Sequence, residues 1–446
     1  MSAAPLSQIP TPGEGEGQRF QPPVPEVIED LGLPPMFLEQ LVLKILYFKG
    51  EITGRQLANH IGLNFSVIES VVDLLKRQHH IAAKASLGMG SVSSVFTMTE
   101  AGRALAREHL EVNTFTGRAP VPIQQYTIGV QMQSAADGWL TPEKLRTAFK
   151  HMVVSERILG QLGPAVNSGK SFLIYGRPGN GKTYLAEGLF YLESDPVYIP
   201  YAIESQGQIV QVFDPVYHQP LEEEDEEESV FSVAKEQTHD GRWVKCKRPF
   251  IMSGGELTLE MLDLHLNPTS RIYDAPFHVK ANNGIYLIDD FGRQKVTPAE
   301  VLNRWIVPME RRIDFLNFKT GGKLTVPFEA FLVFSTNLKP EQLGDEAFLR
   351  RIQYKMFLRS PDEAEFLEIL HRVCEKERIP APPAVIDSFL SRHYRVTHKP
   401  MRRCHPRDLI THALDLIRFE NLPYELTTDL LDRAFECTFV NEEYED

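Results

Sequence analysis

The sequence predicts an α/β fold with a parallel sheet in its central part, a small domain of helices and a β-ribbon before it, and a helical region after it. Three observations predict this order. Short apolar runs in the centre end in glycines or polar residues, as the strands of a buried parallel sheet do. Residues 36–110 combine a helical spacing of apolar positions with two strand-like runs. From about residue 360 onward, helical patterns dominate.

The composition is that of a globular protein with several domains. A length of 446 residues allows two or three domains, and 42% apolar with 24% charged residues are ordinary values. No apolar run approaches the ~18–20 residues of a membrane span, and the amino terminus shows no secretory signal. The cysteines at 246, 374, 404 and 437 form no C-x-x-C pair. We therefore expect a cytoplasmic protein with reduced thiols and no membrane span.

The charge of the chain is unevenly distributed. The net charge of −13 argues against a surface that coats nucleic acid. Seven acidic residues come from the run at 222–228, which we place in an acidic loop at 221–229. Such a run is typical of a solvated loop, and a docking site for a basic partner is the alternative.

Residues 176–183 read GRPGNGKT, which fits the pattern G-x-x-x-x-G-K-[ST] without a mismatch. The apolar run 171–175 predicts a strand before this segment, and residues 184–191 predict a helix after it. Between strand and helix, glycines let backbone N–H groups converge on phosphate oxygens. Lys182 would reach the β- and γ-phosphates of a nucleotide, and the Thr183 hydroxyl would bind Mg²⁺. The candidate nucleotide-binding residues are Gly176, Pro178, Gly179, Asn180, Gly181, Lys182, Thr183 and Tyr184.

The chain also contains a segment that only imitates this pattern. Residues 163–171 end in Gly169, Lys170 and Ser171, but five residues separate the glycines and the segment precedes the strand. Lys170 therefore cannot lie at a strand-to-helix turn, and we treat this segment as a decoy.

A second apolar run, 285–288, ends in two carboxylates. Residues buried on both faces are expected for a strand of a parallel sheet. Asp289 at the end of that strand would hold Mg²⁺, directly or through water. Asp290 would polarise the attacking water.

Three further segments add polar groups. The run 331–336 is followed by Asn337, which could bond the γ-phosphate or orient the water; a role in turn geometry is the alternative. Arg350 and Arg351 precede another strand, and surface solubility or an ion pair is the alternative reading of this pair. Arg407 opens a helix in the helical region.

These motifs, in this order, resemble the AAA+ ATPase superfamily of P-loop NTPases. The phosphate loop is followed by a Walker B strand (285–290), sensor 1 (Asn337), an arginine-finger segment (350–351) and sensor 2 (Arg407). The resemblance covers about residues 141–446 and implies ATP and Mg²⁺ as cofactors, ATP hydrolysis, and a helical lid over the nucleotide.

The resemblance also implies a homo-oligomer, with a hexameric ring as the expected form, because an arginine finger acts across a subunit interface. Arg351, directly before the apolar Ile352, is the better candidate for that finger, and Arg350 is the alternative. The chain departs from the superfamily at Asp290, where a glutamate is usual. The side chain is one methylene shorter, which puts the rate of hydrolysis in doubt more than nucleotide binding.

A β-hairpin is predicted at 312–326 around Thr320, Gly321 and Gly322. A hairpin directly before sensor 1 is similar to the AAA+ branch of MoxR-type chaperones and enhancer-binding activators. In that branch an insertion before the Walker B strand lines the ring pore, and the matching segment here is about 254–274. With the amino-terminal domain included, the chain resembles a widespread bacterial family that joins a winged helix to an AAA+ core.

The amino-terminal domain resembles a winged helix, with three helices, a ribbon around residues 88–90, and a helix from Glu100. The helix that would enter a DNA groove begins near Phe65 and offers Ser66, Glu69 and Asp73 in its first turns. Acidic groups facing phosphates are unfavourable, and residues 36–110 contain eight Lys and Arg against six Asp and Glu. Contact with protein is therefore favoured over contact with nucleic acid.

The predicted organisation has five parts. They are a disordered tail (1–34), a winged-helix domain (35–112), a linker (113–140), an AAA+ nucleotide-binding core (141–359) and a helical lid (360–446). The favoured function is a ring-forming ATPase that remodels or assembles a protein client recruited through the winged helix. The alternatives are a DNA-binding ATPase or transcription-related regulator, and a nucleotide-dependent switch that hydrolyses slowly because of Asp290.

Overall fold

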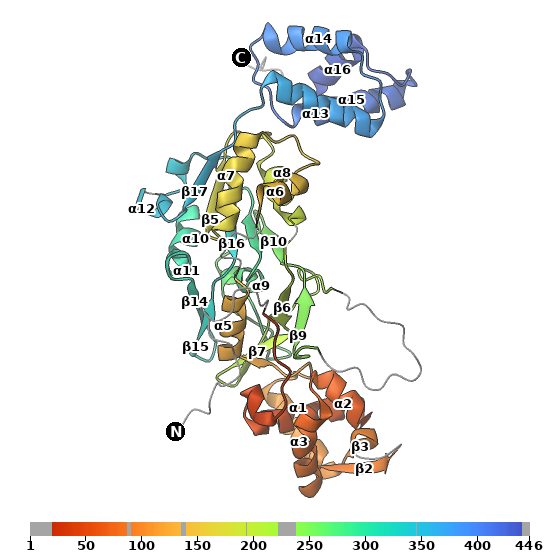
Figure 1. Ribbon diagram of the computed structural model, residues 1–446, viewed down its shortest axis with the longest axis vertical. Coiled ribbons are helices and arrows are strands. Elements are labelled where there is room, and N and C mark those ends of the chain that lie inside the picture. Colours follow the sequence, from red (N-terminus) through yellow and green to blue (C-terminus); the bar gives the residue numbers. More distant parts are fainter. Residues whose placement is uncertain are drawn as a thin grey trace. The chain divides into compact units, whose positions relative to one another are not determined.

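The computed structural model describes residues 20–86, 91–134, 140–192, 194–221, 238–344 and 346–438 (Figure 1). They fall into two compact units. The first unit takes the chain up to residue 139 together with 194–286 and 300–332. The second takes 140–193, 287–299 and the chain from 333 onward. The acidic run at 222–228 lies outside the described residues.

A five-stranded sheet in the order β10-β13-β16-β5-β17 forms the predicted α/β core. Strands β5 and β17 pair in parallel, with Phe172 opposite Tyr354. Every residue of β16 is buried, as expected for a strand covered on both faces. Four of these strands were predicted and are confirmed: β13 (Ile285–Ile288), β16 (Phe331–Thr336), β5 (Ser171–Tyr175) and β17 (Tyr354–Phe357). The edge strand β10 (Phe250–Ser253) was not predicted.

The amino-terminal domain has the predicted helices and ribbon, with one additional short strand. The strands form a sheet in the order β1-β3-β2. Helix α4 begins at the capping residue Thr99, whose hydroxyl accepts from the Gly102 N–H at 3.1 Å. The elements are α1 (Pro35–Lys49), β1 (Glu51–Thr53), α2 (Gly54–Ile61), α3 (Phe65–Arg77), β2 (Ile81–Ser86), β3 (Ser94–Met98) and α4 (Glu100–Val112).

Part of the predicted disordered tail is packed. Phe20 lies edge-on to Trp243 with ring centroids 6.0 Å apart, and Leu31 and Leu33 are buried. The buried Arg242 donates to the Leu31 carbonyl at 3.2 Å. The prediction was therefore wrong for residues 20–34, because Leu31 and Leu33 of this Pro-rich segment find buried sites that local composition does not reveal. Residues 1–19 lie outside the described part.

The predicted linker at 113–140 is also structured in its middle. Strand β4 (Val121–Pro122) pairs with β7, and helix α5 (Ile123–Met132) buries Tyr126 and Val130. The Tyr126 hydroxyl accepts a hydrogen bond from Asn282 at 2.9 Å. The linker prediction was wrong here, because α5 belongs to the core of a β-rich part of the first unit.

That β-rich part combines a second sheet, in the order β11-β12-β8-β7-β4, with two strand pairs, β6–β9 and β14–β15. The pair β14–β15 is the hairpin predicted before Asn337, and Gly321 at its turn has a φ of +92°. The strands are β6 (Val197–Pro200), β7 (Ala202–Ser205), β8 (Gln208–Gln211), β9 (Trp243–Cys246), β11 (His265–Leu266), β12 (Tyr273–Asp274), β14 (Ile313–Asn317) and β15 (Lys323–Pro327).

The amino-terminal domain and the β-rich part share a hydrophobic core. Ala202 and Ile209 of the sheet belong to the same buried cluster as α1 and α3. Arg118 stacks over the Tyr201 ring at 4.7 Å, and the Ala119 N–H donates to the Ile61 carbonyl at 2.8 Å. Within the first unit, the amino-terminal domain is therefore packed against its neighbour and not tethered by a free linker.

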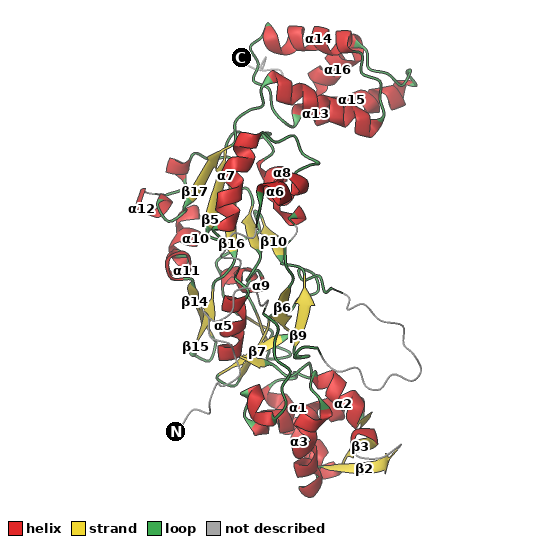
Figure 2. Cartoon of the chain, in the orientation of Figure 1, coloured by secondary structure: helices red, strands yellow, loops and turns green. Residues whose placement is uncertain are grey.

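The second unit holds the helices of the core and the predicted helical region (Figure 2). The helical region has its own buried core, which includes Phe366, Phe389 and Leu409. The core helices are α6 (Pro142–Ala148), α7 (Glu156–Asn167), α8 (Lys182–Glu187) with the 3₁₀ turn η3 (Gly188–Tyr191), and α12 (Glu346–Leu349). The helical region contains α13 (Glu363–Glu377), α14 (Pro383–Leu390), α15 (His405–Glu420) and α16 (Thr428–Thr438).

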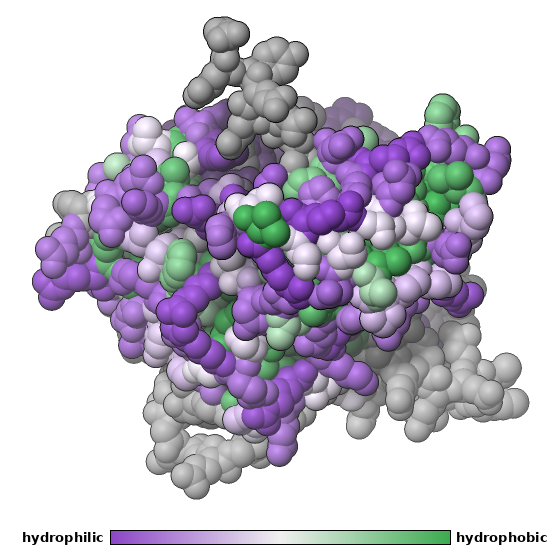
Figure 3. Space-filling view, turned by 90° about the horizontal axis from the view of Figure 1, so that it is seen from above, coloured by the Kyte–Doolittle hydropathy of each residue, from purple (hydrophilic) through white to green (hydrophobic). Residues whose placement is uncertain are grey.

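The connections between the central strands carry three shorter helices, α9 (Phe277–Lys280), α10 (Pro298–Arg304) and α11 (Ile306–Arg311). Across the described residues, we find no helix with both the length and the apolar character that crossing a membrane requires. The face seen in Figure 3 is mainly hydrophilic, and its apolar side chains lie in small separate patches.

Candidate nucleotide-binding site

The phosphate loop connects β5, which ends at Tyr175, to α8, which begins at Lys182. Gly179 and Gly181 have φ values of +80° and +79°, a region that favours glycine. The Leu185 N–H donates to the Gly181 carbonyl at 2.8 Å, and this is the first hydrogen bond of the α8 helix. The N–H groups at positions 182–184 therefore have no partner within the helix and are free to bind phosphate oxygens.

Lys182 is buried, with 5% of its surface exposed. Its Nζ donates to Asn337 Oδ1 at 2.5 Å and to the Arg177 carbonyl at 3.1 Å. Burial lowers the pKa of Lys182, the carboxylates of Asp290 and Asp289 oppose that shift, and the charge of Arg402 adds to it. The ammonium group thus lies in a partly desolvated site where an anion would be bound strongly.

Thr183 and Asp289 lie together next to the phosphate loop. The Thr183 hydroxyl is 2.9 and 3.0 Å from the two carboxylate oxygens of Asp289. A hydroxyl and a carboxylate beside a phosphate site are the hard oxygen donors that Mg²⁺ prefers, with waters and phosphate oxygens completing the coordination. The donor set therefore fits the ion that the sequence predicts.

Asp290 adopts a left-handed backbone conformation, with a φ of +47°. Its carboxylate accepts a hydrogen bond from Asn337 Nδ2 at 2.8 Å. Asn337 thus joins Lys182 to Asp290 through the two ends of one amide group. Strained backbone of this kind is common at functional sites when surrounding contacts hold it in place.

Gln294 supplies those contacts, and sequence reasoning missed it. Its Nε2 donates to the Asp289 carbonyl at 2.8 Å and to the Asp290 carbonyl at 3.3 Å, and its Oε1 accepts from the Gly292 N–H at 2.7 Å. A lone glutamine a few residues after a strand carries no signal in one sequence, so only the folded loop reveals this residue as a positioning group.

The segment before α15 lies directly on the phosphate loop. The Cys404 N–H donates to the Gly179 carbonyl at 3.0 Å, and the Arg402 guanidinium donates to the Pro178 carbonyl. Arg403 donates to Glu365 at 2.7 Å and to the Val153 carbonyl at 2.8 Å. The two adjacent arginines are visible in the sequence, but nothing local distinguishes them from Arg407.

Arg407 itself is not among the groups that bond the phosphate loop. Its side chain is 75% exposed and lies 3.4 Å from Asp408. Burial raises the pKa of Tyr184, and the positive charge of Arg407 acts in the opposite direction. The His151 ring contacts the rings of both Tyr184 and Tyr191, and the three form a small aromatic group beyond the loop.

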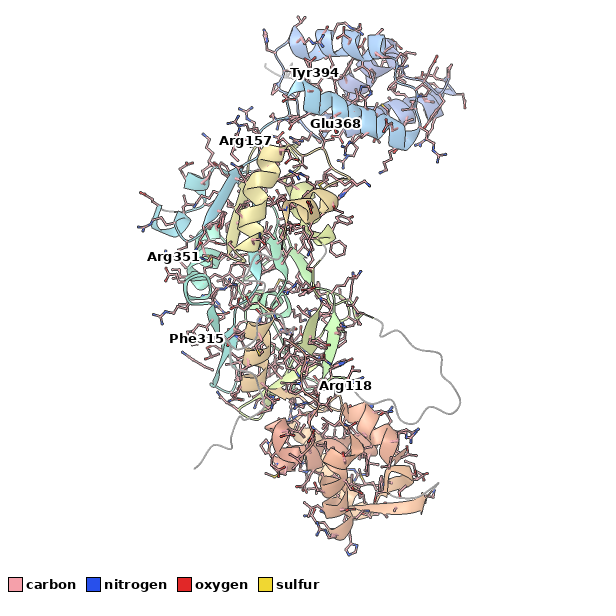
Figure 4. The ribbon with its side chains drawn as sticks, in the orientation of Figure 1. Arg118, Arg157, Phe315, Arg351, Glu368 and Tyr394 are labelled. Carbon is pink, nitrogen blue, oxygen red and sulfur yellow. The ribbon has the colours of Figure 1, made fainter. Side chains whose placement is uncertain are left out.

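Arg350 and Arg351 follow α12, far along the sheet from the phosphate loop. The Arg351 carbonyl accepts from the hydroxyl of Ser171, the first residue of β5, at 3.1 Å, while the loop leaves from the last residue of β5. Five residues of strand span about 13–17 Å. Arg351 (Figure 4) therefore lies at the opposite end of β5 from the phosphate loop of its own chain.

Asn180 lies in the loop and is almost fully buried, with 1% exposed surface. Its Nδ2 lies 3.4 Å from the Leu358 carbonyl and 3.4 Å from the Ser360 hydroxyl, which connects the loop to the chain leaving β17. Gly176 is close to the same carbonyl, because a Cβ there would lie 2.5 Å from the Leu358 oxygen. The glycine at this position allows loop and strand to approach.

Comparisons with known proteins add the following. A family model described as a domain of unknown function, DUF8689, matches residues 362–437, which is the helical region. A search among curated proteins finds no match. The solved structures that resemble the chain include NtrX from Brucella abortus in complex with ADP, at 12% identity and a TM-score of 0.39, covering 78% of this chain and 69% of that one. A RuvB variant from Thermotoga maritima has 13% identity and a TM-score of 0.34, covering 70% of this chain and 75% of that one. At these scores the likeness carries no argument, and the site is interpreted from its own geometry.

The contact between phosphate loop and helical region predicts different effects for two glycines. Both Gly179 and Gly169 have positive φ, so an alanine at either position costs about 1–2 kcal/mol of strain. At Gly179 a Cβ would also lie 2.7 Å from Cys404 Sγ, whereas at Gly169 nothing lies within 4 Å. We expect Gly179→Ala to weaken ATP binding measured by calorimetry and Gly169→Ala to lower only the thermal midpoint. Equal ATP affinities of the two variants would contradict this assignment.

Proposed function

We propose that the protein is an ATP hydrolase of the AAA+ type that uses ATP and Mg²⁺. One observation carries the proposal: the phosphate-loop lysine, the Thr183–Asp289 pair and the Asn337–Asp290 pair lie in one connected cluster. Phosphate binding, a cation site and a candidate base are the three parts that hydrolysis of a nucleoside triphosphate requires.

The chain's own residues divide this work. The loop N–H groups and Lys182 would bind the phosphate chain, and Thr183 with Asp289 would hold Mg²⁺, which neutralises developing phosphate charge when bound. Asp290 would accept a proton from the attacking water, and Asn337 would orient that water or the terminal phosphate. The Asn337 amide is hydrogen-bonded to both Lys182 and Asp290. It would therefore have to exchange these partners for the water or the terminal phosphate when nucleotide binds.

The same proposal includes a homo-oligomer, with a hexameric ring as the form implied by the sequence resemblance. Its support is the position of Arg351, whose carbonyl bonds the start of β5 while the phosphate loop follows the end of that strand. An arginine there is better placed to act on a neighbouring subunit than on its own, with Arg350 as the alternative. Arg407 stays a prediction for a contact from the helical region.

We further propose that the ATPase remodels or assembles a protein client recruited by the amino-terminal domain, a winged helix in this interpretation. The support is the character of α3, whose Ser66, Glu69 and Ser70 are exposed. Farther along the helix, Asp73 pairs with Lys76 at 2.7 Å. A polar and acidic face of this kind favours protein over phosphate backbone.

Two substitutions and one control variant test the chemistry. We expect Lys182→Ala to abolish ATP binding, because it removes the buried ammonium, and the exposed decoy Lys170→Ala to leave binding unchanged. Asp290→Asn should retain ATP binding but lower the hydrolysis rate by about 10²-fold or more. Calorimetry and phosphate release measure the two effects. Unchanged turnover in the Asp290 variant would remove the role given to that residue.

The shared site is tested by mixing subunits. If Arg351 completes the site of a neighbour, Arg351→Ala mixed with wild-type protein should reduce activity by more than dilution, because one defective subunit impairs a second site. Phosphate release is measured across a series of mixing ratios, with Lys170→Ala as the control subunit. A strictly proportional loss would argue against a finger that acts between subunits.

The alternative function, a DNA-binding ATPase, predicts a different behaviour of the amino-terminal domain. For a protein-binding domain, we expect the full chain to bind duplex DNA weakly and Arg77→Ala to leave that binding unchanged. Fluorescence anisotropy over a range of salt concentrations measures both. Tight binding with a steep salt dependence that disappears on deletion of residues 36–110 would establish the alternative.

A further inference from the structure

We propose that Arg402, in the segment before α15, is the residue through which the helical region contacts the phosphates of a bound nucleotide. The inference rests on the proposed function and adds a residue that no motif in the sequence singles out. It is carried by the contacts of the segment 402–404 with the phosphate loop.

The side chain of Arg402 lies over the loop. Its guanidinium donates to the Pro178 carbonyl, and a Cβ at Gly179 would lie 3.2 Å from Arg402 Cδ. The backbone is anchored as well, because the Cys404 N–H donates to the Gly179 carbonyl at 3.0 Å. The guanidinium is therefore held at the loop by its own hydrogen bond and by the backbone hydrogen bond of Cys404, two residues further along.

The charge of Arg402 is available to a ligand. Within the described parts of the chain, the Pro178 carbonyl is the partner of its guanidinium, and no carboxylate is paired with it. A guanidinium has five N–H donors, so most of its hydrogen-bonding capacity remains unused. Arg402 is also near enough to Lys182 for its charge to oppose protonation of that lysine, and an anion between the two cations would relieve the repulsion.

The two neighbouring arginines are placed differently. Arg403 is largely buried and already bonded to Glu365 and the Val153 carbonyl, so it braces the helical region. Arg407 is mostly exposed and lies 3.4 Å from Asp408. Among these three, Arg402 alone combines contact with the phosphate loop and a charge without a carboxylate partner in the described structure.

Binding of a phosphate would let Arg402 exchange the Pro178 carbonyl for phosphate oxygens, which form stronger, charge-assisted hydrogen bonds. Because Arg402 is three residues before the first residue of α15, that exchange would move the start of the helix. The nucleotide would thereby set the position of α15 relative to the loop, as in closure around a ligand.

The test compares variants of Arg402 and Arg407 in the full chain. ATP and ADP affinities are measured by calorimetry, and circular dichroism confirms the fold. We expect Arg402→Ala to weaken the binding of both nucleotides by about tenfold to hundredfold. Arg402→Gln keeps an N–H donor but has no charge, and we expect a similar loss. Arg402→Lys should recover part of the affinity, and Arg407→Ala should lose less than Arg402→Ala.

Two outcomes would overturn the inference alone. Wild-type affinity in Arg402→Gln would show that the residue only braces the loop, and a loss confined to Arg407→Ala would assign the contact to that arginine. If the wild-type chain binds neither nucleotide, the proposed function fails together with the inference. The wild-type and Lys182→Ala measurements therefore separate the two failures.

Discussion

The hydrogen bond between Lys182 and Asn337 is the interaction on which the candidate site depends. A buried ammonium group is unfavourable unless it is bonded, and here the amide oxygen at the end of β16 satisfies it at 2.5 Å. The sheet order makes this possible, because β16 lies between β13, which carries the carboxylates, and β5, which carries the loop. The amide nitrogen donates to Asp290. The Asn337 side chain, which follows β16, therefore connects the lysine of the loop after β5 with the carboxylate that follows β13.

A second constraint is the close contact between the phosphate loop and the chain that enters and leaves the helical region. The Leu358 carbonyl accepts from the Asn180 amide, and the Cys404 N–H donates to the Gly179 carbonyl. The Arg403 guanidinium donates both to the Glu365 carboxylate and to the Val153 carbonyl. The loop is thus held from the sheet side and from the side of α15. These contacts explain why glycines are needed at 176 and 179, where a Cβ would meet backbone or side-chain atoms within 3 Å.

The amino-terminal half contains elements that the sequence predicts and others that it does not. The helices and ribbon of residues 36–110 were predicted because their apolar periodicity is local. The packing of residues 20–34 and of α5 was not, since a Pro-rich segment with isolated apolar residues has no periodicity to detect. Phe20, Leu31 and Tyr126 contact partners that are distant in the sequence, which are Trp243, Arg242 and Asn282 respectively.

The sequence by itself determined the phosphate loop, the carboxylates after the next core strand and Asn337, because each is a contiguous motif whose chemistry depends on residue type and local spacing. Only the tertiary structure decided which side chains surround them. Gln294 acts through two backbone carbonyls, and Arg402, Arg403 and Arg407 are alike in sequence but differ in burial and partners. Charge and hydrogen-bonding capacity are properties of a residue, whereas availability to a ligand is set by the neighbours that folding brings to it.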